Sequence, residues 1–210
     1  MLYLIRHGES ISNVNKTFTG QGNAPLTALG HQQAACIQSY FLGIHVDRIL
    51  SSDLIRAVDT AMPLSKVSRV PIEPMGELRE IYGGKWEGEK FAELETRYPE
   101  DYALWRRDIG NSRPTGGESI RELCDRVCCA VERIQRANPD HTIVVATHAV
   151  PIRAMLTKWL TGDVTCMQEI PWVPNASITK VEFVDGQFKP TEIGITEHLQ
   201  GMITNLPGKI

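Results

Sequence analysis

Two histidines and two arginines in this sequence have the types and positions needed to bind and attack a tetrahedral oxyanion. Arg6 and His7 directly follow one apolar run, His148 follows another, and Arg56 lies a few residues beyond a third. The planar guanidinium group of arginine binds oxyanions through paired, charge-assisted hydrogen bonds, and helix N-termini add amide donors. The four residues therefore predict a phosphate pocket.

His7 is the candidate nucleophile of this pocket. A neutral imidazole attacks phosphorus when a hydrogen bond holds one ring nitrogen and the other nitrogen presents its lone pair, which gives a phosphohistidine intermediate. Arg6 precedes His7 in the sequence and suits the neutralisation of phosphoryl charge. The remaining histidines are interpreted as structural or surface residues, namely His31, His45, His141 and His198.

The scaffold predicted for these side chains is a three-layer α/β/α fold. Unbroken apolar runs alternate with helical patterns, which is typical of a mostly parallel sheet covered by helices on both faces. The predicted strands are 2–5, 48–51, 142–146 and a last strand, 177–184, whose alternating pattern favours a place near the sheet edge and an antiparallel direction. Ligands of open α/β sheets bind at the carboxyl ends of the strands, where Arg6, His7 and His148 stand.

Helices are predicted from capping residues and from apolar residues at helical spacing. The predicted caps are Thr27, then Ser52 or Asp53, then Ser119 with Glu122 as a capping box, and Pro151 suits the first turn of a further helix. The second of these helices runs to about residue 66 and carries Arg56 in its first turn. Its position brings this arginine close to the carboxyl end of the preceding strand.

Residues 84–113 depart from the alternation of strands and helices. They form short, charged helical patterns that carry Trp86, Phe91, Tyr98, Tyr102 and Trp105. We expect a small helical, cap-like insertion over the active edge of the sheet. The chain has 210 residues, enough for one large core, so we expect a single domain over 1–210 that includes this insertion.

The composition excludes several classes of protein. Hydrophobic residues make up 42% and charged residues 22% of the chain, which is ordinary for a globular protein. The net charge of −3 disfavours a nucleic-acid partner, because such proteins carry excess lysine and arginine. The sequence shows neither a basic leader nor an apolar run of about 20 residues, so we expect no membrane association and a cytoplasmic location.

The five cysteines give no sign of a disulfide framework or a metal site. Their number is odd and they show no C-x-x-C pairing, so we expect reduced thiols. Cys124 and Cys128 are four residues apart on a predicted helix but lack a matching histidine or cysteine pair. The histidines come with arginines rather than with the carboxylates that a cation would require, so no metal is predicted.

Six ordered blocks of the sequence resemble the histidine phosphatase superfamily, the phosphoglycerate mutase-like group. They are Arg6-His7-Gly8-Glu9-Ser10 with Asn13, Pro25-Leu26-Thr27 with Gly30, 51–54 with Arg56-Ala57 and Thr60-Ala61, Leu78 with Glu80 and 84–88, 116–119, and Thr147-His148. The resemblance covers nearly the whole chain. It is nearest to the α-ribazole phosphatases and the phosphatases similar to the bisphosphatase of fructose 2,6-bisphosphate.

The resemblance implies a role for each residue that matches the motifs. His7 corresponds to the phosphorylated nucleophile, Arg6 and Arg56 to the clamp on the phosphoryl group, and His148 to the histidine that binds an equatorial phosphoryl oxygen. Glu80 corresponds to the acid that protonates the leaving oxygen and then helps to deprotonate the attacking water. Without the resemblance, a solvated ion pair would be the ordinary interpretation of Glu80.

Three further positions are implied to contact phosphate or substrate: Asn13, Ser10 and the amide of Gly22. The sequence also departs from the pattern of the group. Asn23 stands where many of these phosphatases have aspartate, and Ala149 and Val150 stand where a glycine pair often follows the second histidine. These changes leave the phosphate clamp intact and alter the wall of the leaving-group pocket.

The predicted function is a metal-independent phosphatase that hydrolyses small phosphomonoesters through phosphorylated His7 and needs no cofactor. A cofactor-dependent phosphoglycerate mutase is the first alternative. Mutases carry a longer basic insertion, whereas residues 84–113 mix basic residues, among them Lys85, Lys90, Arg106 and Arg107, with more acids than that role requires. A non-catalytic module that binds a phosphorylated ligand is the second alternative, but it would not need His7 or Glu80.

Overall fold

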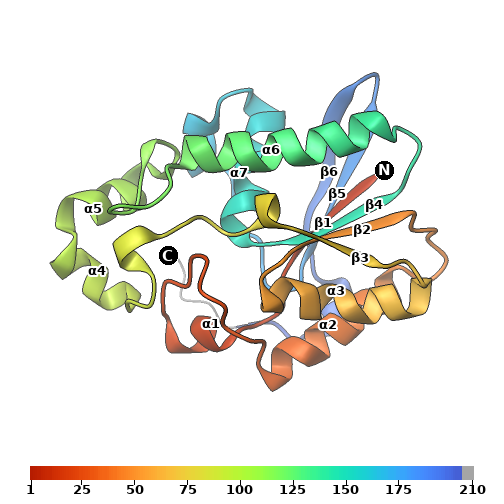
Figure 1. Cartoon of the computed structure of the whole chain (residues 1–210), viewed down its shortest axis with the longest axis horizontal. Coiled ribbons are helices and arrows are strands. Elements are labelled where there is room, and N and C mark those ends of the chain that lie inside the picture. Colours follow the sequence, from red (N-terminus) through yellow and green to blue (C-terminus); the bar gives the residue numbers. More distant parts are fainter. Residues whose placement is uncertain (205–210) are drawn as a thin grey trace.

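The computed structural model describes residues 1–204 and contains a six-stranded sheet with the strand order β3-β2-β4-β1-β5-β6. Strands β1 to β4 run parallel, whereas β5 and β6 pair antiparallel (Figure 1). Their bounds are β1 Leu2–Arg6, β2 Arg48–Ser52, β3 Ile72–Met75, β4 Ile143–Thr147, β5 Ile178–Val184 and β6 Gln187–Ile195. The predicted α/β class with a mostly parallel sheet is confirmed.

Strand β1 lies in the middle of the sheet and is buried on both faces. Leu2 and Leu4 join one hydrophobic cluster, and Tyr3 and Ile5 join the other. The alternation follows from the two-residue period of a strand, which sends successive side chains to opposite faces. A strand that is buried on both faces requires an unbroken apolar run, and residues 2–5 supply it before Arg6.

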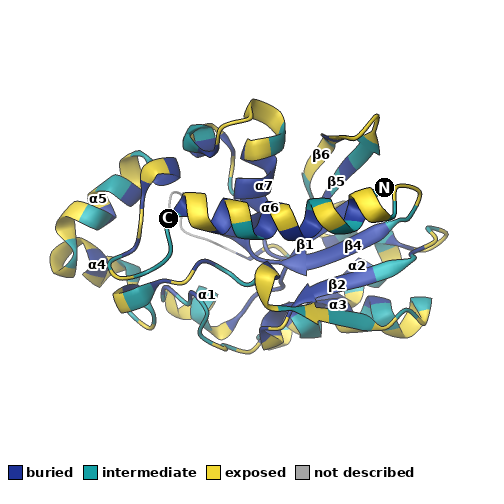
Figure 2. Cartoon of the chain, turned by 45° about the horizontal axis from the view of Figure 1, so that its top comes forward, coloured by how far each residue is buried: buried dark blue, intermediate teal, exposed yellow. Residues whose placement is uncertain are grey.

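Helices cover the two faces of the sheet, as predicted. Helices α6 (Ile120–Ala137) and α7 (Ala149–Thr161) pack on one face, and α2 (Ala28–Tyr40) and α3 (Ile55–Ser68) pack on the other (Figures 1 and 2). Within the described residues, no helix combines the length and the apolar character needed to span a membrane.

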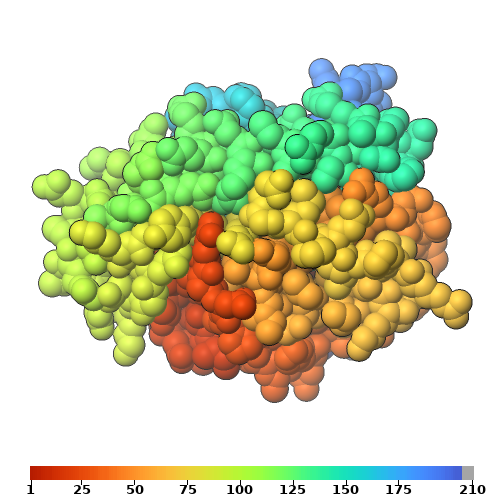
Figure 3. Space-filling view, in the orientation of Figure 1, coloured from red at the N-terminus to blue at the C-terminus, as the bar shows by residue number. Residues whose placement is uncertain are grey.

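The predicted insertion is a helical lobe beside the carboxyl ends of the strands. It contains α4 (Phe91–Arg97), α5 (Pro99–Arg107) and two 3-10 turns, η2 (Gly84–Trp86) and η3 (Ile109–Asn111). Phe18, from the segment after α1 (Ile11–Asn15), packs edge-on against three aromatic rings of this lobe, those of Trp86, Phe91 and Trp105. In Figure 3 the two parts of the chain adjoin on the surface.

The predicted cap of α3 was wrong by one or two positions. Leu54 is the N-cap residue, and the side-chain Oδ1 of Asn23 accepts a hydrogen bond from the Ile55 amide at 2.8 Å. Asp53 instead binds the side chain of Arg79, and Ser52 faces the second histidine of the site. The capping acceptor for this helix comes from a distant loop, which spacing along the chain does not reveal.

Two strands and one short helix were not predicted. Strand β3 has four residues, including Pro74, at one edge of the sheet, and β6 forms the opposite edge with Pro190 and Gly194 in its sequence. Edge strands tolerate proline and glycine, so they lack the apolar signal of central strands. Strand β5 is antiparallel as predicted, but β6 rather than β5 is the last strand. Helix α1 is little more than one turn long.

The first turn of α2 packs directly against the loop that follows β1. A methyl group on Gly30 would overlap the carbonyl oxygen of Glu9, and one on Gly8 would press on Gly30. Because both partners are backbone atoms, a change of side-chain rotamer cannot relieve the overlap. The close approach fixes the loop that carries His7.

Replacement of Gly30 by alanine is expected to lower the free energy of unfolding by about 2 kcal/mol, as overpacking of a tight contact does. The better helix propensity of alanine offsets only about 1 kcal/mol of this cost. Urea denaturation measures the change. Gly76→Ala is the control, because a methyl group there meets no atom within 4 Å, and its expected effect is about 0.5 kcal/mol or less. Equal stabilities of the two variants would contradict this account of the packing.

Candidate active site

The site lies at the carboxyl ends of the adjacent parallel strands β1 and β4. Arg6 pairs in register with Thr147, so the next residues, His7 and His148, leave the two strands at the same level. Their ring centroids are 5.2 Å apart, and both side chains are buried. The two histidines predicted from separate strand ends are thus neighbours.

The imidazole of His7 has a defined tautomer. Its Nδ1 lies 2.7 Å from the carbonyl oxygen of Gly8, and since a carbonyl only accepts, Nδ1 carries the proton. The lone pair is then on Nε2. Burial and the charges of Arg56 and Arg6 hold the pKa of His7 well below its usual value. The ring is therefore neutral at pH 7, as a nucleophile must be.

The two predicted arginines are buried beside His7 and are anchored by carbonyl groups. Arg56 donates to the carbonyl oxygens of Gly22 at 2.7 Å and Gly20 at 2.8 Å, and Arg6 donates to that of Val173 at 2.6 Å. Burial lowers the pKa of each guanidinium to about 10, so both remain charged at pH 7. Because carbonyls do not neutralise charge, the two cations create a positive potential that favours an anion.

His148 is positioned by Ser52 at the end of β2. Its Nε2 lies 2.8 Å from Ser52 Oγ, which also accepts a hydrogen bond from the Leu54 amide. If the hydroxyl donates to Nε2, Nδ1 carries the ring proton. Among the described residues this buried Nδ1 has no hydrogen-bond partner, and the same is true of the buried Nε of Arg6. Buried donors without partners are costly, so both atoms favour an oxyanion that can accept from them.

Glu80 stands across the cavity from the arginines, in the segment after η1 (Gly76–Leu78). Its Oε1 accepts from the Ile81 amide at 2.9 Å and its Oε2 from the Val150 amide at 3.4 Å. Burial raises the pKa of Glu80 despite the opposing effect of these amides and of Arg56. A carboxyl group with a raised pKa suits a general acid.

Asn13 presents its amide nitrogen to the cavity because its oxygen is occupied. Its Oδ1 accepts from the backbone amide and the hydroxyl of Ser10, each at 3.0 Å, and from Asn175 Nδ2 at 3.2 Å. Asn175 also donates to the carbonyl oxygen of His7 at 2.9 Å. Ser10 thus touches Asn13 rather than lining the cavity. Asn175 was not predicted, since it lies in irregular chain far along the sequence.

The loop of residues 19–22 holds Arg56 in place. The amide of Gly22 donates to the carbonyl oxygen of Thr19 at 2.9 Å, and the Gly22 carbonyl accepts from Arg56. A contact of this amide with substrate would therefore compete with a bond inside the loop. Glu87, another residue missed from sequence, fixes the same loop by accepting from the amide of Gln21 at 2.8 Å.

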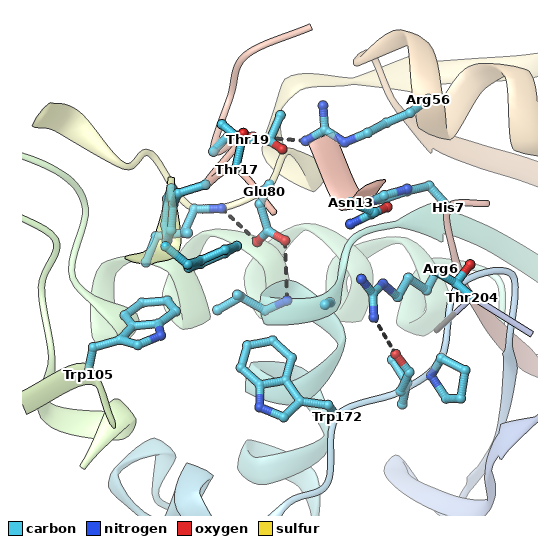
Figure 4. Close-up of a pocket in the computed structure, with 18 of the residues that line it drawn as sticks. Arg6, His7, Asn13, Thr17, Thr19, Arg56, Glu80, Trp105, Trp172 and Thr204 are labelled. Atoms are coloured by element: carbon cyan, nitrogen blue, oxygen red, sulfur yellow. Dashed lines mark hydrogen bonds between the residues drawn. The ribbon is translucent and has the colours of Figure 1, made fainter. Parts of the chain in front are cut away.

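Arg6, His7, Asn13, Arg56 and Glu80 line a cavity of about 340 Å³, a size suited to a small ligand, and His148 packs against His7 behind this lining. Figure 4 shows Glu80 between the side of the cavity that carries Arg6, His7 and Arg56 and the side that carries two tryptophans. The rest of the wall is apolar or uncharged and includes Thr17, Phe18, Thr19, Ile81, Phe91, Trp105, Val150, Trp172, Ile203 and Thr204. Within residues 1–204, no three His, Cys, Asp or Glu side chains are grouped so that they could hold a metal ion.

Comparisons with known proteins agree with this geometry. The sequence profile of the histidine phosphatase superfamily (branch 1) matches residues 2–196. The chain is 32% identical to the adenosylcobalamin/α-ribazole phosphatase of Escherichia coli over 70% of this chain and 72% of that protein. It is 29% identical to phosphoserine phosphatase 1 of Hydrogenobacter thermophilus, over 94% and 93% of the two chains.

The fold also matches solved structures. That of Bacillus stearothermophilus YhfR superposes with a TM-score of 0.89 at 27% identity and covers 94% of this chain and 98% of that chain. The predicted family is confirmed, and the named enzymes among these relatives are phosphatases. A profile that spans most of the chain, together with two adjacent histidines and two arginines at one site, shows that this protein belongs to the histidine phosphatase superfamily.

Proposed function

We propose that this protein hydrolyses small phosphomonoesters through a phosphohistidine intermediate on His7. The observation that carries the proposal is the bond between His7 Nδ1 and the Gly8 carbonyl, which leaves Nε2 unprotonated beside two buried guanidinium groups. A neutral nucleophile and an anion clamp in one cavity are what phosphoryl transfer requires. The proposal needs neither a metal nor a cofactor, and the cytoplasmic location stays a prediction.

In the first step, His7 Nε2 attacks phosphorus and the bond to the ester oxygen breaks. Glu80 gives its proton to the leaving oxygen, so an alcohol departs. Arg6 and Arg56 neutralise the charge on the phosphoryl oxygens, and His148 Nδ1 donates to one of them. Phospho-His7 and a Glu80 carboxylate remain.

In the second step, water attacks the same phosphorus atom from the side that the alcohol has left. Glu80 takes a proton from the water as the new P–O bond forms and the P–N bond breaks. Orthophosphate leaves and His7 and Glu80 return to their starting states. Water is the only co-reactant, so the cycle balances.

The cavity favours hydrolysis over a mutase reaction. In the described part of the chain, none of the six basic residues of the insertion lines the cavity that contains His7; they are Lys85, Lys90, Arg97, Arg106, Arg107 and Arg113. The insertion contributes Phe91 and Trp105 instead. A mutase must keep an acidic substrate bound while it is rephosphorylated, and among residues 1–204 this wall offers no cation to the second acidic group of such a substrate.

The test of the proposed function is release of inorganic phosphate from 4-nitrophenyl phosphate in excess chelator, and from 3-phosphoglycerate with 2,3-bisphosphoglycerate. We expect full hydrolysis of the first substrate with chelator present. Abolition of activity by the chelator would overturn the metal-independent mechanism. Efficient isomerisation of 3-phosphoglycerate with negligible phosphate release would show a mutase instead.

The Glu80→Gln variant is expected to lose about 10²- to 10⁴-fold in kcat for alkyl phosphates, because glutamine cannot protonate the leaving oxygen. The loss is expected to be smaller for 4-nitrophenyl phosphate, whose leaving group departs without a proton. Steady-state rates with both substrates measure the contrast. Glu77→Gln is the control, since Glu77 is exposed three residues earlier. Equal losses with both substrates would contradict the role of Glu80 as an acid.

The same role sets the pH dependence of kcat/KM. The raised pKa of Glu80 keeps its proton to a higher pH than usual, and activity is expected to fall as pH rises through that pKa. His7 is neutral throughout this range because its pKa is depressed. The pH profile of an alkyl phosphate is therefore expected to lose its descending limb in Glu80→Gln. An unchanged limb in that variant would assign it to another group.

A further inference from the structure

The half of the cavity beyond Glu80 has an aromatic wall. Phe91 and Trp105 reach it from α4 and α5, Phe18 from the segment after α1, and Trp172 from the chain after η4 (Val164–Glu169). The uncharged polar side chains of the lining include the hydroxyls of Thr17, Thr19 and Thr204, of which Thr204 lies beside Arg6 in Figure 4. Flat apolar surfaces of this kind bind planar rings.

Among residues 1–204, the ionic groups that line this cavity are confined to its other end. The charged lining residues are Arg6, Arg56 and Glu80, all of them used by the proposed reaction. Arg106, Arg107 and Arg153 line a second cavity, which shares Trp105 and Trp172 with the first, and the Arg153 guanidinium lies 4.2 Å from the centroid of the Trp172 ring. A second carboxylate or phosphate on the leaving group would thus be desolvated against aromatic rings, which is costly for an unpaired charge.

One donor in this wall has no partner. The indole Nε1 of Trp105 is buried and makes no hydrogen bond within residues 1–204, although the Nε1 of nearby Trp86 donates to Thr115 Oγ1 at 3.1 Å. Figure 4 shows the nitrogen-bearing edge of Trp105 turned toward the cavity. An unpaired buried N–H is costly, and an acceptor atom on a bound group would relieve that cost.

We propose that the leaving-group site of this enzyme selects an uncharged aromatic or heteroaromatic group, and that Trp105 is a specificity-determining residue that donates its indole N–H to that group. The inference rests on the proposed function, since it concerns the same cavity. Phosphomonoesters with a second acidic group are poor substrates on this account. The aromatic rings provide contact area, and the indole N–H of Trp105 donates a hydrogen bond to an acceptor atom on the leaving group.

Two matched substrates test the charge preference. The substrates 4-carbamoylphenyl phosphate and 4-carboxyphenyl phosphate have nearly the same size and shape and differ by one negative charge on the leaving group. We expect kcat/KM to favour the carbamoyl compound by about tenfold or more. Equal values, or a preference for the carboxylate, would overturn the inference.

A lysine in the wall is expected to reverse the trend. In Thr17→Lys, an ammonium group enters the aromatic half of the cavity, so the ratio of the two kcat/KM values should fall toward one. Thr191→Lys adds the same charge on β6, away from the cavity, and should keep the wild-type ratio. If both variants behave alike, the charge of the wall does not set the preference.

The role of Trp105 has its own test. Trp105→Phe keeps most of the ring but removes the N–H, so the preference for 4-carbamoylphenyl phosphate over phenyl phosphate should fall by about three- to tenfold. An unchanged ratio would show that the indole N–H does not contact the leaving group. If the preference for the carbamoyl compound is lost while circular dichroism and the thermal transition show a folded variant, the role of the indole N–H as donor is supported.

Binding measurements separate this inference from the proposed function. The non-hydrolysable 4-carbamoylbenzyl and 4-carboxybenzyl phosphonates can be compared by calorimetry with the wild-type protein. Tighter binding of the carbamoyl compound supports the inference even if no phosphate is ever released, in which case the proposed function alone fails. Rapid hydrolysis with equal binding of the two phosphonates would refute the inference and leave the phosphatase reaction intact.

Discussion

The His7→Ala variant is expected to lose phosphomonoesterase activity by about 10⁴-fold or more, because alanine has no group that can attack phosphorus in place of the imidazole. The structure gives this side chain a fixed tautomer through Gly8 and a neutral ring through burial and the nearby arginines. The initial rate of phosphate release from 4-nitrophenyl phosphate measures the loss. His45→Ala is the matched control, since His45 is exposed and should leave the rate unchanged.

Retention of the fold must accompany the loss in His7→Ala. Inorganic phosphate should still bind, because Arg6, Arg56 and His148 remain, and calorimetry measures that binding. Activity above about one tenth of the wild-type rate in His7→Ala would contradict the covalent mechanism, since each tenfold step in rate is only about 1.4 kcal/mol and a nucleophile is worth several such steps.

The Arg56→Met variant is expected to lose about 10³-fold or more in kcat, the effect of removing an arginine that neutralises a transferring phosphoryl group. Arg56 is buried, and its guanidinium group is held by two carbonyl oxygens of the 19–22 loop. Steady-state kinetics with 4-nitrophenyl phosphate gives the ratio. Arg121→Met, which removes the same charge from an exposed position on α6, serves as the control.

Lysine is not expected to restore the activity lost in Arg56→Met. Its single ammonium group cannot span the carbonyls of Gly20 and Gly22 and also present a planar pair of donors to phosphate. The Arg56→Lys variant should therefore stay at least about tenfold below the wild type. Near-normal kcat in Arg56→Lys would mean that charge alone, without the geometry of the fork, accounts for the contribution of Arg56.

The central strands and the residues at their ends were predictable from sequence because burial leaves a clear signal there. An unbroken apolar run that stops at polar residues predicts a buried parallel strand that ends at a site, and for this reason Arg6, His7 and His148 were chosen as candidate site residues. Arg56 followed from the start of the next helix. In the structure, Arg6, His7 and Arg56 line one cavity and His148 packs against His7.

The residues that the sequence did not reveal act across long separations along the chain. Asn175 reaches His7 and Asn13 from irregular chain, Glu87 fixes the 19–22 loop from the insertion, and Asn23 caps α3 from a loop. Each is a polar residue in a connection, where local spacing predicts only a turn. Their roles depend on tertiary contacts, which a pattern within one segment cannot encode.

The aromatic wall of the cavity was also not predictable from the sequence pattern. The sequence placed Trp105 in an insertion over the active edge but could not tell core from substrate contact. In the structure Trp105 packs on Phe18 and Trp86 and also lines the cavity, so one side chain belongs both to the core and to the wall. Trp172 lies in the connection after α7, where the sequence shows no helix or strand pattern. Its place in the wall depends on how that connection folds near the carboxyl ends of the strands.

During turnover, Nε2 of His7 is expected to carry the phosphoryl group, and a rapid-quench experiment can trap this intermediate. A phosphorus-labelled substrate is mixed with the enzyme, stopped in alkali to preserve acid-labile phosphate, and the labelled peptide and isomer are identified by mass spectrometry and chromatography. We expect label on His7 as the Nε2 isomer, because Nδ1 is held by the Gly8 carbonyl. Label on Nδ1, label on His148, or turnover without any labelled enzyme would contradict this expectation.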